Sequence, residues 1–190
     1  NMNDEDISKK IESMKKEFVG EEIRGRNLSI IGLGAIGSMV AEQAINLGMK
    51  VKAYDPGLTV DIALGLPSSL VRCDSMESCF DDADYVSLHI PLNSSTEGII
   101  NKDKLKLLNK DSILINFSRG GIVNEGDLID QLDNGMLLKY VTDFPTKNLL
   151  KRINSQRDVI IFPHLGASTK ESEINCAVMA CVPIVDFLIY

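Results

Sequence analysis

The sequence lacks any excess of basic charge. Its 190 residues include 20 lysines and arginines and 27 aspartates and glutamates, which gives a formal net charge of −7. A protein that binds nucleic acid needs a basic face for the phosphates, and this balance does not provide one. The composition therefore argues against a nucleic-acid partner.

Cysteine patterns that hold metal ions or disulfide frameworks are also missing. The four cysteines, at positions 73, 79, 176 and 181, form no CxxC pair and show no metal-ligand spacing. We interpret them as free thiols in a reducing cytosol, and we expect no metal site. The polar, acidic start of the sequence shows no secretory pattern, which also favours the cytoplasm.

No hydrophobic run is long enough to cross a membrane. The longest, residues 176–190, contains Pro183 and Asp186 and is shorter than the roughly 20 residues that a spanning helix needs. The chain is 44% hydrophobic and 25% charged, as is usual for a globular protein. Its length suits one domain with a sizeable core and is marginal for two.

The glycine-rich segment GLGAIG at residues 32–37 is the most informative motif. It follows a short apolar strand, residues 28–31, and leads into a helical pattern that ends at Gly48. A second strand, residues 51–54, ends on Asp55, about 20 residues past the glycines. This order is that of a dinucleotide-binding βαβ unit. Strand, glycines, helix, second strand and acid all occur at the expected spacing, which argues against a chance glycine turn in an unrelated α/β protein.

Each part of this unit has a physical purpose. Gly32 permits a sharp turn, Gly34 leaves room for a pyrophosphate, and Gly37 lets helix and strand pack closely. The helix amino terminus presents free N–H groups to the phosphates. A carboxylate at position 55 accepts hydrogen bonds from ribose hydroxyls and repels a 2′-phosphate, so the sequence predicts NAD rather than NADP.

Strands and helices alternate along the rest of the chain. This alternation predicts an α/β fold, a Rossmann-type doubly wound parallel sheet with helices on both faces. Nearly continuous apolar runs are typical of buried parallel strands. The further strands are expected at residues 70–73, 85–89, 112–117, 140–142 and 159–162.

Segments outside this alternation carry their own expectations. Residues 4–18 show the spacing of an amphipathic helix. Four basic side chains predict a basic loop over residues 147–157. The final helix should begin at a capping box made by Ser168 and Glu171. Over residues 176–190 it is apolar almost all round, so we expect other protein to bury it, and we expect a homodimer.

Ligands of open parallel sheets bind outside the carboxyl ends of the strands. Arg119 follows one strand, and its guanidinium fork could clamp the carboxylate of a substrate; the alternative is a surface salt bridge. His164 follows the last strand and is the natural proton carrier near pH 7. A lone histidine is more often structural, an interpretation we apply to His89, which lies in a strand that ends before Pro91.

Several of these segments together resemble the signatures of the D-isomer-specific 2-hydroxyacid dehydrogenases. The matching segments are GLGAIG at 32–37, HIPL at 89–92, NFSRGG at 116–121 and PHLGAST at 163–169. Residues 140–145 and 173–180 are most similar to the short form of the D-3-phosphoglycerate dehydrogenases. The resemblance implies hydride transfer between NAD and a D-2-hydroxy acid substrate, with 3-phosphoglycerate oxidised to 3-phosphohydroxypyruvate in serine synthesis.

The resemblance also implies roles for matched positions. Arg119 would bind the substrate carboxylate and the C2 oxygen, and His164 would be the acid/base. The implied cofactor contacts are Gly32, Gly34, Ala35, Ile36, Gly37, Asp55, Pro91, Phe117, Ser118, Asp143, His164 and Ala167.

One position departs from the family pattern. In many members a glutamate after the Phe-Pro-Thr turn pairs with the histidine, and here Lys147 takes that position. A carboxylate orients the ring and favours its charged form, whereas an ammonium favours the neutral form. Either Lys147 does other work, such as binding a substrate phosphate, or the loop is registered differently.

The length is the second departure, because family members build a substrate-binding domain from segments on both sides of the nucleotide domain. We expect residues 1–190 to form a single NAD-binding domain, with most of the substrate-binding domain absent. Residues 1–24 would be a crossover helix and hinge, and residues 169–190 the second crossover helix. Such a chain should bind NAD and turn over substrate poorly by itself.

Three other functions stay open. The chain could belong to a lactate or a glyoxylate/hydroxypyruvate dehydrogenase, to an NAD-sensing interaction protein of transcription, or to a plain nucleotide-binding module. The short pattern after Tyr140 argues against the sensor, while Arg119 and His164 do not decide the question.

Overall fold

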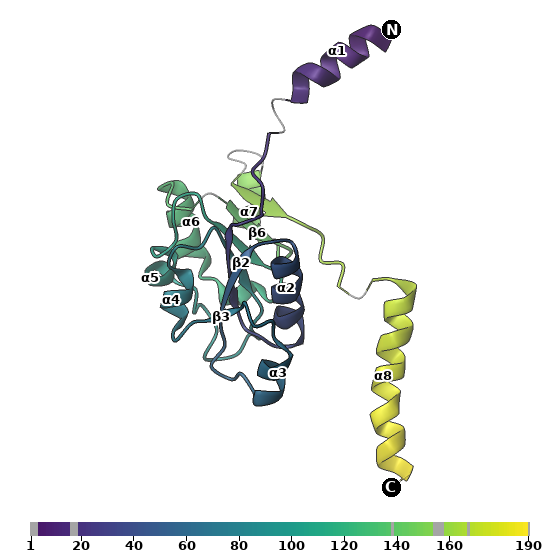
Figure 1. Cartoon of the computed structure of the whole chain (residues 1–190). Helices are drawn as coiled ribbons and strands as arrows, with labels where there is room; N and C mark the ends of the chain where they lie inside the picture. The colour runs from purple at the N-terminus through teal and green to yellow at the C-terminus, as the bar shows by residue number, and fades with distance from the viewer. Residues whose placement is uncertain (1–3, 16–18, 138, 154–157, 167, 190) are drawn as a thin grey trace.

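A seven-stranded parallel sheet forms the centre of the computed structural model, which describes residues 4–15, 19–137, 139–153, 158–166 and 168–189 (Figure 1). The strands are β1 (Asn27–Ile31), β2 (Lys50–Tyr54), β3 (Val71–Arg72), β4 (Tyr85–Leu88), β5 (Ile113–Asn116), β6 (Lys139–Thr142) and β7 (Val159–Ile161). Their order across the sheet is β3-β2-β1-β4-β5-β6-β7. The chain thus runs outward from β1, returns beside it at β4, and forms the switch point of a Rossmann-type fold. The predicted fold class is confirmed.

Helices cover both faces of this sheet. They are α2 (Ala35–Asn46), α3 (Val60–Gly65), α4 (Met76–Phe80), α5 (Lys102–Leu105), α6 (Glu125–Asp133) and α7 (Lys147–Ile153). On one face, buried side chains of α4 to α7 pack with those of β4 to β7, Phe80, Leu88 and Leu114 among them. On the other, Ala41 and Ala44 of α2 pack against β1 and β2. The expected strands agree with the observed ones to within one residue at each end.

The predicted basic loop at residues 147–157 is wrong, because its first half is helix α7. Leu149 of this helix is buried against the core. Arg152 is only 8% exposed and pairs with Asp133 at 2.8 Å and with Asp158. An arginine can be buried where carboxylates neutralise it, so its charge did not mark a solvated loop. Residue 157 lies outside the described part of the chain.

The last helix, α8 (Lys170–Ile189), begins one residue later than the predicted capping box implies. Thr169 is the capping residue, and its hydroxyl accepts a hydrogen bond from the Ser172 N–H at 3.1 Å. Ser168 instead donates to the Leu165 carbonyl. Neighbouring hydroxyl residues offer equivalent caps in sequence, and the path of the preceding loop selects one of them.

Helix α1 (Asp4–Met14) precedes the sheet and covers part of the predicted 4–18 helix; residues 16–18 are not described. In Figure 1, α1 and α8 project from the sheet in different directions. Large apolar side chains of α8 are exposed, including Val178 at 54%, Met179 at 74% and Phe187 at 83%. Among the helices in the described ranges, none combines the length and apolarity needed to span a membrane.

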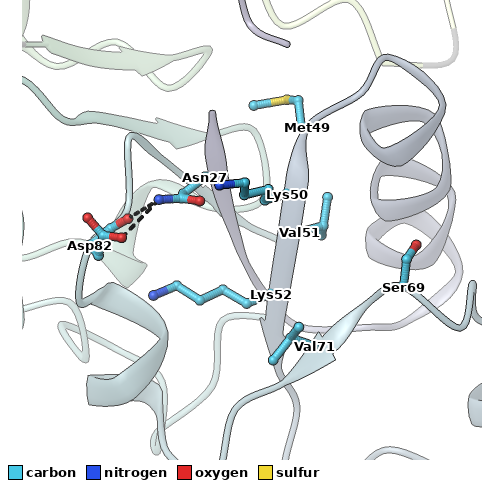
Figure 2. A pocket seen from close by; sticks show the side chains of 8 residues that line it. All are labelled: Asn27, Met49, Lys50, Val51, Lys52, Ser69, Val71 and Asp82. Atoms are coloured by element: carbon cyan, nitrogen blue, oxygen red, sulfur yellow. Dashed lines mark hydrogen bonds between the residues drawn. The ribbon is translucent and has the colours of Figure 1, made fainter. Parts of the chain in front are cut away.

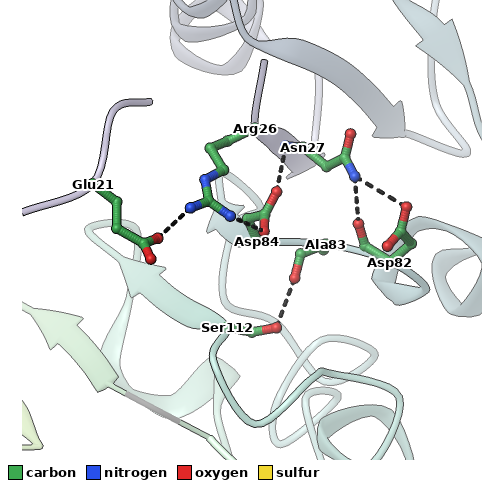
Figure 3. A network of polar contacts seen from close by, with 7 residues as sticks. All are labelled: Glu21, Arg26, Asn27, Asp82, Ala83, Asp84 and Ser112. Atoms are coloured by element: carbon green, nitrogen blue, oxygen red, sulfur yellow. Dashed lines mark hydrogen bonds and ion pairs between the residues drawn. The ribbon is translucent and has the colours of Figure 1, made fainter. Parts of the chain in front are cut away.

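Polar contacts fix the connector between α1 and β1 to the amino edge of the sheet (Figure 3). Arg26 pairs with Glu21 and with the Asp84 carboxylate, at 3.5 Å for the latter. Asp84 also accepts from the Asn27 backbone N–H at 2.7 Å, and Asn27 donates to the Asp82 carbonyl at 2.9 Å. The start of β1 is therefore held against the loop before β4.

Candidate functional site

Five strands of the sheet end in register. Ile31, Leu88, Asn116, Thr142 and Ile161 are successive partners across β1, β4, β5, β6 and β7. The residues that follow them lie together at the carboxyl edge, where parallel sheets bind ligands. These residues are Gly32, His89, Phe117, Asp143 and Phe162.

At two positions of the glycine turn after β1, there is no room for a side chain, as predicted. Gly32 has φ +98°, and a β-carbon there would lie 2.5 Å from the His89 carbonyl oxygen. A β-carbon on Gly37 would lie 2.0 Å from the Gly32 carbonyl oxygen. A β-carbon on Gly34 would meet no atom within 4 Å, and no side chain caps the amino end of α2. The turn is thus closely packed at Gly32 and Gly37 and open at Gly34. Gly34 lies at the amino end of α2, where a pyrophosphate would bind.

Asp55 and the start of α2 lie on either side of this turn. One Asp55 oxygen accepts from the Leu33 N–H at 2.7 Å, and the other accepts from the Gly57 N–H at 2.7 Å. Carboxylate oxygens have two acceptor sites each, so both can still accept ribose hydroxyls. Ala35 and Ile36 are exposed in the first turn of α2. Their roles toward pyrophosphate and ribose remain predictions from the sequence.

His164 forms a close pair with Asp143. Its Nδ1 lies 2.8 Å from Asp143 Oδ2, and the His164 ring packs on Phe144 with the ring centres 5.1 Å apart. The Asp143 side chain is 13% exposed and the His164 side chain 52%. Asp143 Oδ1 is buried and has no hydrogen-bond partner among the described residues. The pair joins two residues that the sequence assigned to different roles, while Lys147 lies exposed at the start of α7.

Arg119 lies on the loop after β5, and its side chain is exposed. Its Nη1 donates to the Ser118 carbonyl at 2.6 Å. A β-carbon on the next residue, Gly120, would lie 3.2 Å from Phe144 Cβ. The loop after β5 therefore contacts the turn after β6, which also carries Asp143. This contact brings the predicted substrate clamp to the side of the His164–Asp143 pair.

Asn116 is a residue that the sequence interpretation missed. It is fully buried and bonds the loop that follows it, with its amide nitrogen 2.8 Å from the Arg119 carbonyl. The sequence contained one indication of its importance. Asn116 is a polar residue on the same face of the strand as buried Leu114, which is a core position. An unpaired amide there would be costly, which makes a specific partner necessary.

The remaining predicted cofactor contacts take different places. Pro91 ends the segment after β4, and its carbonyl accepts from the Thr96 hydroxyl at 2.6 Å. The Phe117 ring meets the Phe162 ring edge to face, with centres 6.0 Å apart. Ser118 donates to Asn116 through both its N–H and its hydroxyl. Position 167 lies outside the described residues.

His89 differs from His164 in its surroundings. It is partly buried, and its Nε2 lies 2.9 Å from the hydroxyl of Ser87 on the same strand. Burial lowers the pKa of His89, so the neutral ring is favoured. This environment supports the structural interpretation of His89.

Several cavities lie away from the glycine turn, including the following two. One of about 410 Å³ is at the amino ends of β1, β2 and β3, where Lys50, Lys52 and Val71 border it (Figure 2). The other, of about 200 Å³, lies behind the Arg119 loop and is lined by Gly120, Tyr140 and Phe144, among others. Within the described ranges no group of three histidine, cysteine or acidic side chains is placed to hold a metal ion.

Comparison with known proteins agrees with this geometry. Residues 2–166 match the family described as D-isomer specific 2-hydroxyacid dehydrogenase, NAD binding domain. The chain belongs to this family. A D-3-phosphoglycerate dehydrogenase of Synechocystis is 35% identical over 97% of the chain, and a hydroxypyruvate reductase of Thermotoga maritima is 35% identical over 84%. The chain spans 34% and 52% of these relatives, so it corresponds to part of their length.

Solved structures give the same result. A D-isomer specific 2-hydroxyacid dehydrogenase from Lactobacillus delbrueckii, complexed with NAD, has a TM-score of 0.70 and 31% identity, covering 82% of this chain and 51% of that one. A D-lactate dehydrogenase from Aquifex aeolicus, complexed with NAD and lactic acid, has a TM-score of 0.76 and 25% identity, covering 95% and 61%. The chain is thus an NAD-binding domain of Rossmann type.

The residues at the carboxyl edge fit the dinucleotide. The open space at Gly34 and the uncapped start of α2 suit a pyrophosphate. Asp55 suits the adenosine ribose. Asp143 lies on the same edge, paired with His164, where the sequence predicts the nicotinamide.

Proposed function

We propose that this chain is the NAD-binding domain of a D-2-hydroxyacid dehydrogenase and that it carries the acid/base of the reaction. The observation that supports this most directly is the His164–Asp143 pair at 2.8 Å, placed beside the Arg119 loop at the cofactor edge. Nδ1 carries a hydrogen when it donates to Asp143 Oδ2, which leaves Nε2 as the nitrogen that exchanges a proton with substrate.

Bound NAD supplies the hydride acceptor. The Arg119 guanidinium binds the substrate carboxylate through paired hydrogen bonds and holds the C2 hydroxyl toward the histidine. His164 Nε2 takes the hydroxyl proton as the hydride leaves C2, and Asp143 stabilises the imidazolium that forms. The carboxylate that many family members place after the Phe-Pro-Thr turn is replaced in this role by Asp143.

We infer that the substrate is 3-phosphoglycerate, which would place the protein in serine synthesis. The support is the pair of D-3-phosphoglycerate dehydrogenases from Synechocystis and Bacillus subtilis, at 35% and 36% identity. The hydroxypyruvate reductase at 35% identity makes hydroxypyruvate the second candidate. The test is NADH formation or consumption by the protein at its full natural length, with 3-phosphoglycerate, hydroxypyruvate and D-lactate compared. Turnover of 3-phosphoglycerate at the highest kcat/KM supports the inference, and preference for another acid overturns it.

We further propose a homodimer and crossover roles for α1 and α8. The outer face of α2 bears an apolar groove lined by Ile36, Met39 and Leu47, all more than half exposed, and α8 bears exposed apolar side chains as well. Apolar surface of this extent is favourably buried against protein, either a second copy or a substrate-binding domain. Light scattering after size-exclusion chromatography tests the dimer, and a monomer at micromolar concentration contradicts it.

A cytoplasmic location is the last part of the proposal. All four cysteines are unpaired, and Cys176 and Cys181 are exposed on α8, as is usual in a reducing compartment. Fractionation of the source cells, with immunodetection of the protein, tests this location.

A further inference from the structure

Asn116 on β5 and Tyr140 on β6 lie diagonally across the two paired strands, behind the loop that carries Arg119. Asn116 is 0% exposed and Tyr140 is 2% exposed. The Asn116 amide nitrogen lies 3.2 Å from the Tyr140 hydroxyl oxygen and 2.8 Å from the Arg119 carbonyl oxygen. An amide nitrogen has two hydrogens, so it can donate one to each.

The other end of the same side chain holds the next part of the loop. Asn116 Oδ1 accepts from the Ser118 N–H at 3.1 Å and from the Ser118 hydroxyl at 3.0 Å. One buried side chain therefore bonds two of the three residues that follow it. Its amide can occupy only one orientation, because a flip would place donors against the Ser118 N–H and an acceptor against the Arg119 carbonyl.

Packing alone does not fix this loop. Gly120 and Gly121 follow Arg119 and have no side chains to anchor it. The cavity of about 200 Å³ behind the loop is lined by Gly120 and Tyr140, so there is room for the loop to move inward. A second bond to the Arg119 carbonyl, from the Ile122 N–H, is longer at 3.4 Å. The Asn116 amide thus makes the shorter of the two bonds at the Arg119 carbonyl. The far end of the loop is held separately, by the Gly98 N–H that donates to the Gly121 carbonyl at 2.8 Å.

We propose that Asn116 and Tyr140 are positioning residues that hold the Arg119 loop in the geometry needed to bind the substrate carboxylate. Tyr140 accepts the second amide hydrogen and so leaves no buried donor of Asn116 unpaired, and Asn116 holds the loop. This proposal rests on the proposed function, in which Arg119 binds that carboxylate. Burial raises the pKa of the Tyr140 hydroxyl, so it stays neutral throughout the physiological range.

Two substitutions and one control test this tether in the protein at its full natural length. Tyr140→Phe removes the hydroxyl and keeps the ring. Asn116→Asp keeps the acceptor for Ser118 and removes both donors. Tyr85→Phe, in β4 at the amino edge of the sheet, is the control, because it removes a tyrosine hydroxyl far from the loop.

The tether predicts a change in substrate binding with little change in cofactor binding. Tyr140→Phe should raise KM for the 2-hydroxy acid about fivefold and Asn116→Asp by roughly 10- to 100-fold, since they remove one and two hydrogen bonds. The Kd for NADH should change less than twofold. Tyr85→Phe should match the wild type. Unchanged KM in both variants, or an equal rise in the control, overturns the proposal.

Amide hydrogen exchange gives a readout that does not require turnover. Exchange at Ser118 to Ile122 should become about fivefold faster in Tyr140→Phe and faster still in Asn116→Asp, while β1 and β4 keep wild-type protection. Unchanged loop exchange refutes the tether whatever the activity. If the wild-type protein oxidises none of the 2-hydroxy acids but the loop exchange changes as expected, the tether stands and the proposed substrate role of Arg119 fails.

Discussion

Asp84 and Asp143 lie at opposite edges of the same sheet and differ in how their carboxylate oxygens are used. At the amino edge, Asp84 is 34% exposed, and its two oxygens contact Arg26 and the Asn27 N–H (Figure 3). At the carboxyl edge, Asp143 is 13% exposed, and within the described part of the chain only one of its oxygens has a partner, His164. The more buried carboxylate is therefore the less satisfied one.

We interpret this difference as one of role, structural for Asp84 and functional for Asp143. A buried polar atom without a partner costs free energy, so its presence at Asp143 requires an explanation, and a role in catalysis is one. The amino edge is complete in itself and anchors the connector to β1. The carboxyl edge is open at Gly34 and at the start of α2, where we propose that the dinucleotide binds.

The largest expected effect comes from His164. His164→Gln removes the group that takes the hydroxyl proton, and general acid–base catalysis typically contributes about 10²–10⁴-fold. We expect kcat to fall by that factor, with the NADH Kd close to wild type in calorimetric titration. A variant that keeps a tenth or more of the wild-type kcat contradicts the assignment.

The matched pair Asp143→Asn and Asp84→Asn tests the comparison itself. Asp143→Asn removes the negative charge that stabilises the imidazolium and can present an N–H donor to His164 Nδ1, and we expect kcat to fall on the order of 10²-fold. Long-range proton–nitrogen NMR of the His164 ring should then lose the Nδ1–H tautomer. Asp84→Asn should leave kcat unchanged and lower the free energy of unfolding by about 1–2 kcal/mol, measured by urea denaturation. Equal effects on kcat in both variants would contradict a catalytic role for Asp143 that Asp84 does not share.

Asp55 should give a smaller effect, confined to the cofactor. Asp55→Ala removes the hydrogen bonds from Leu33 and Gly57 and the acceptor for the ribose hydroxyls. We expect the NADH Kd to rise roughly tenfold, and the preference over NADPH to shrink because the charge that repels the 2′-phosphate is gone. Parallel calorimetric titrations with the two cofactors measure this. Strong NADPH binding by the wild type would show that Asp55 does not select NAD.

His89 should give the smallest effect, on stability alone. Burial lowers the His89 pKa from its ordinary value of 6.5, so below that pH the unfolded chain binds a proton that the folded chain does not. His89 therefore lowers stability as the pH falls below 6.5 and has no such effect above it. His89→Gln should flatten the pH dependence of the urea midpoint in that window. An unchanged slope would show that His89 is not the group responsible.

Much of the fold could be predicted from the sequence because parallel strands and glycine turns depend on local chemistry. Continuous apolar runs marked the strands, and the spacing from Gly32 to Asp55 marked the nucleotide-binding unit. The errors arose where charged residues were buried. Arg152 was interpreted as part of a solvated loop, because its partners Asp133 and Asp158 are brought to it by the packing of α7.

The candidate site was predictable residue by residue, but its pairings were not. Arg119, Asp143 and His164 each follow a strand, so their shared edge follows from the sheet. The sequence did not indicate that Asp143 would contact His164, since the expected carboxylate was one after the Phe-Pro-Thr turn. Asn116 and Tyr140 were not singled out as functional, because a buried hydrogen bond across two strands leaves no mark in a single sequence.

The sequence by itself determined the class of fold, the cofactor unit and the family, since each depends on residue type at short spacing. Tertiary structure alone decided which side chains meet. Strand order places β6 between β5 and β7, which brings Asp143 to His164 and lets the Tyr140 hydroxyl reach Asn116 diagonally across the two paired strands. Contacts between residues more than 20 positions apart depend on how the sheet is assembled, and short-range patterns contain no record of that assembly.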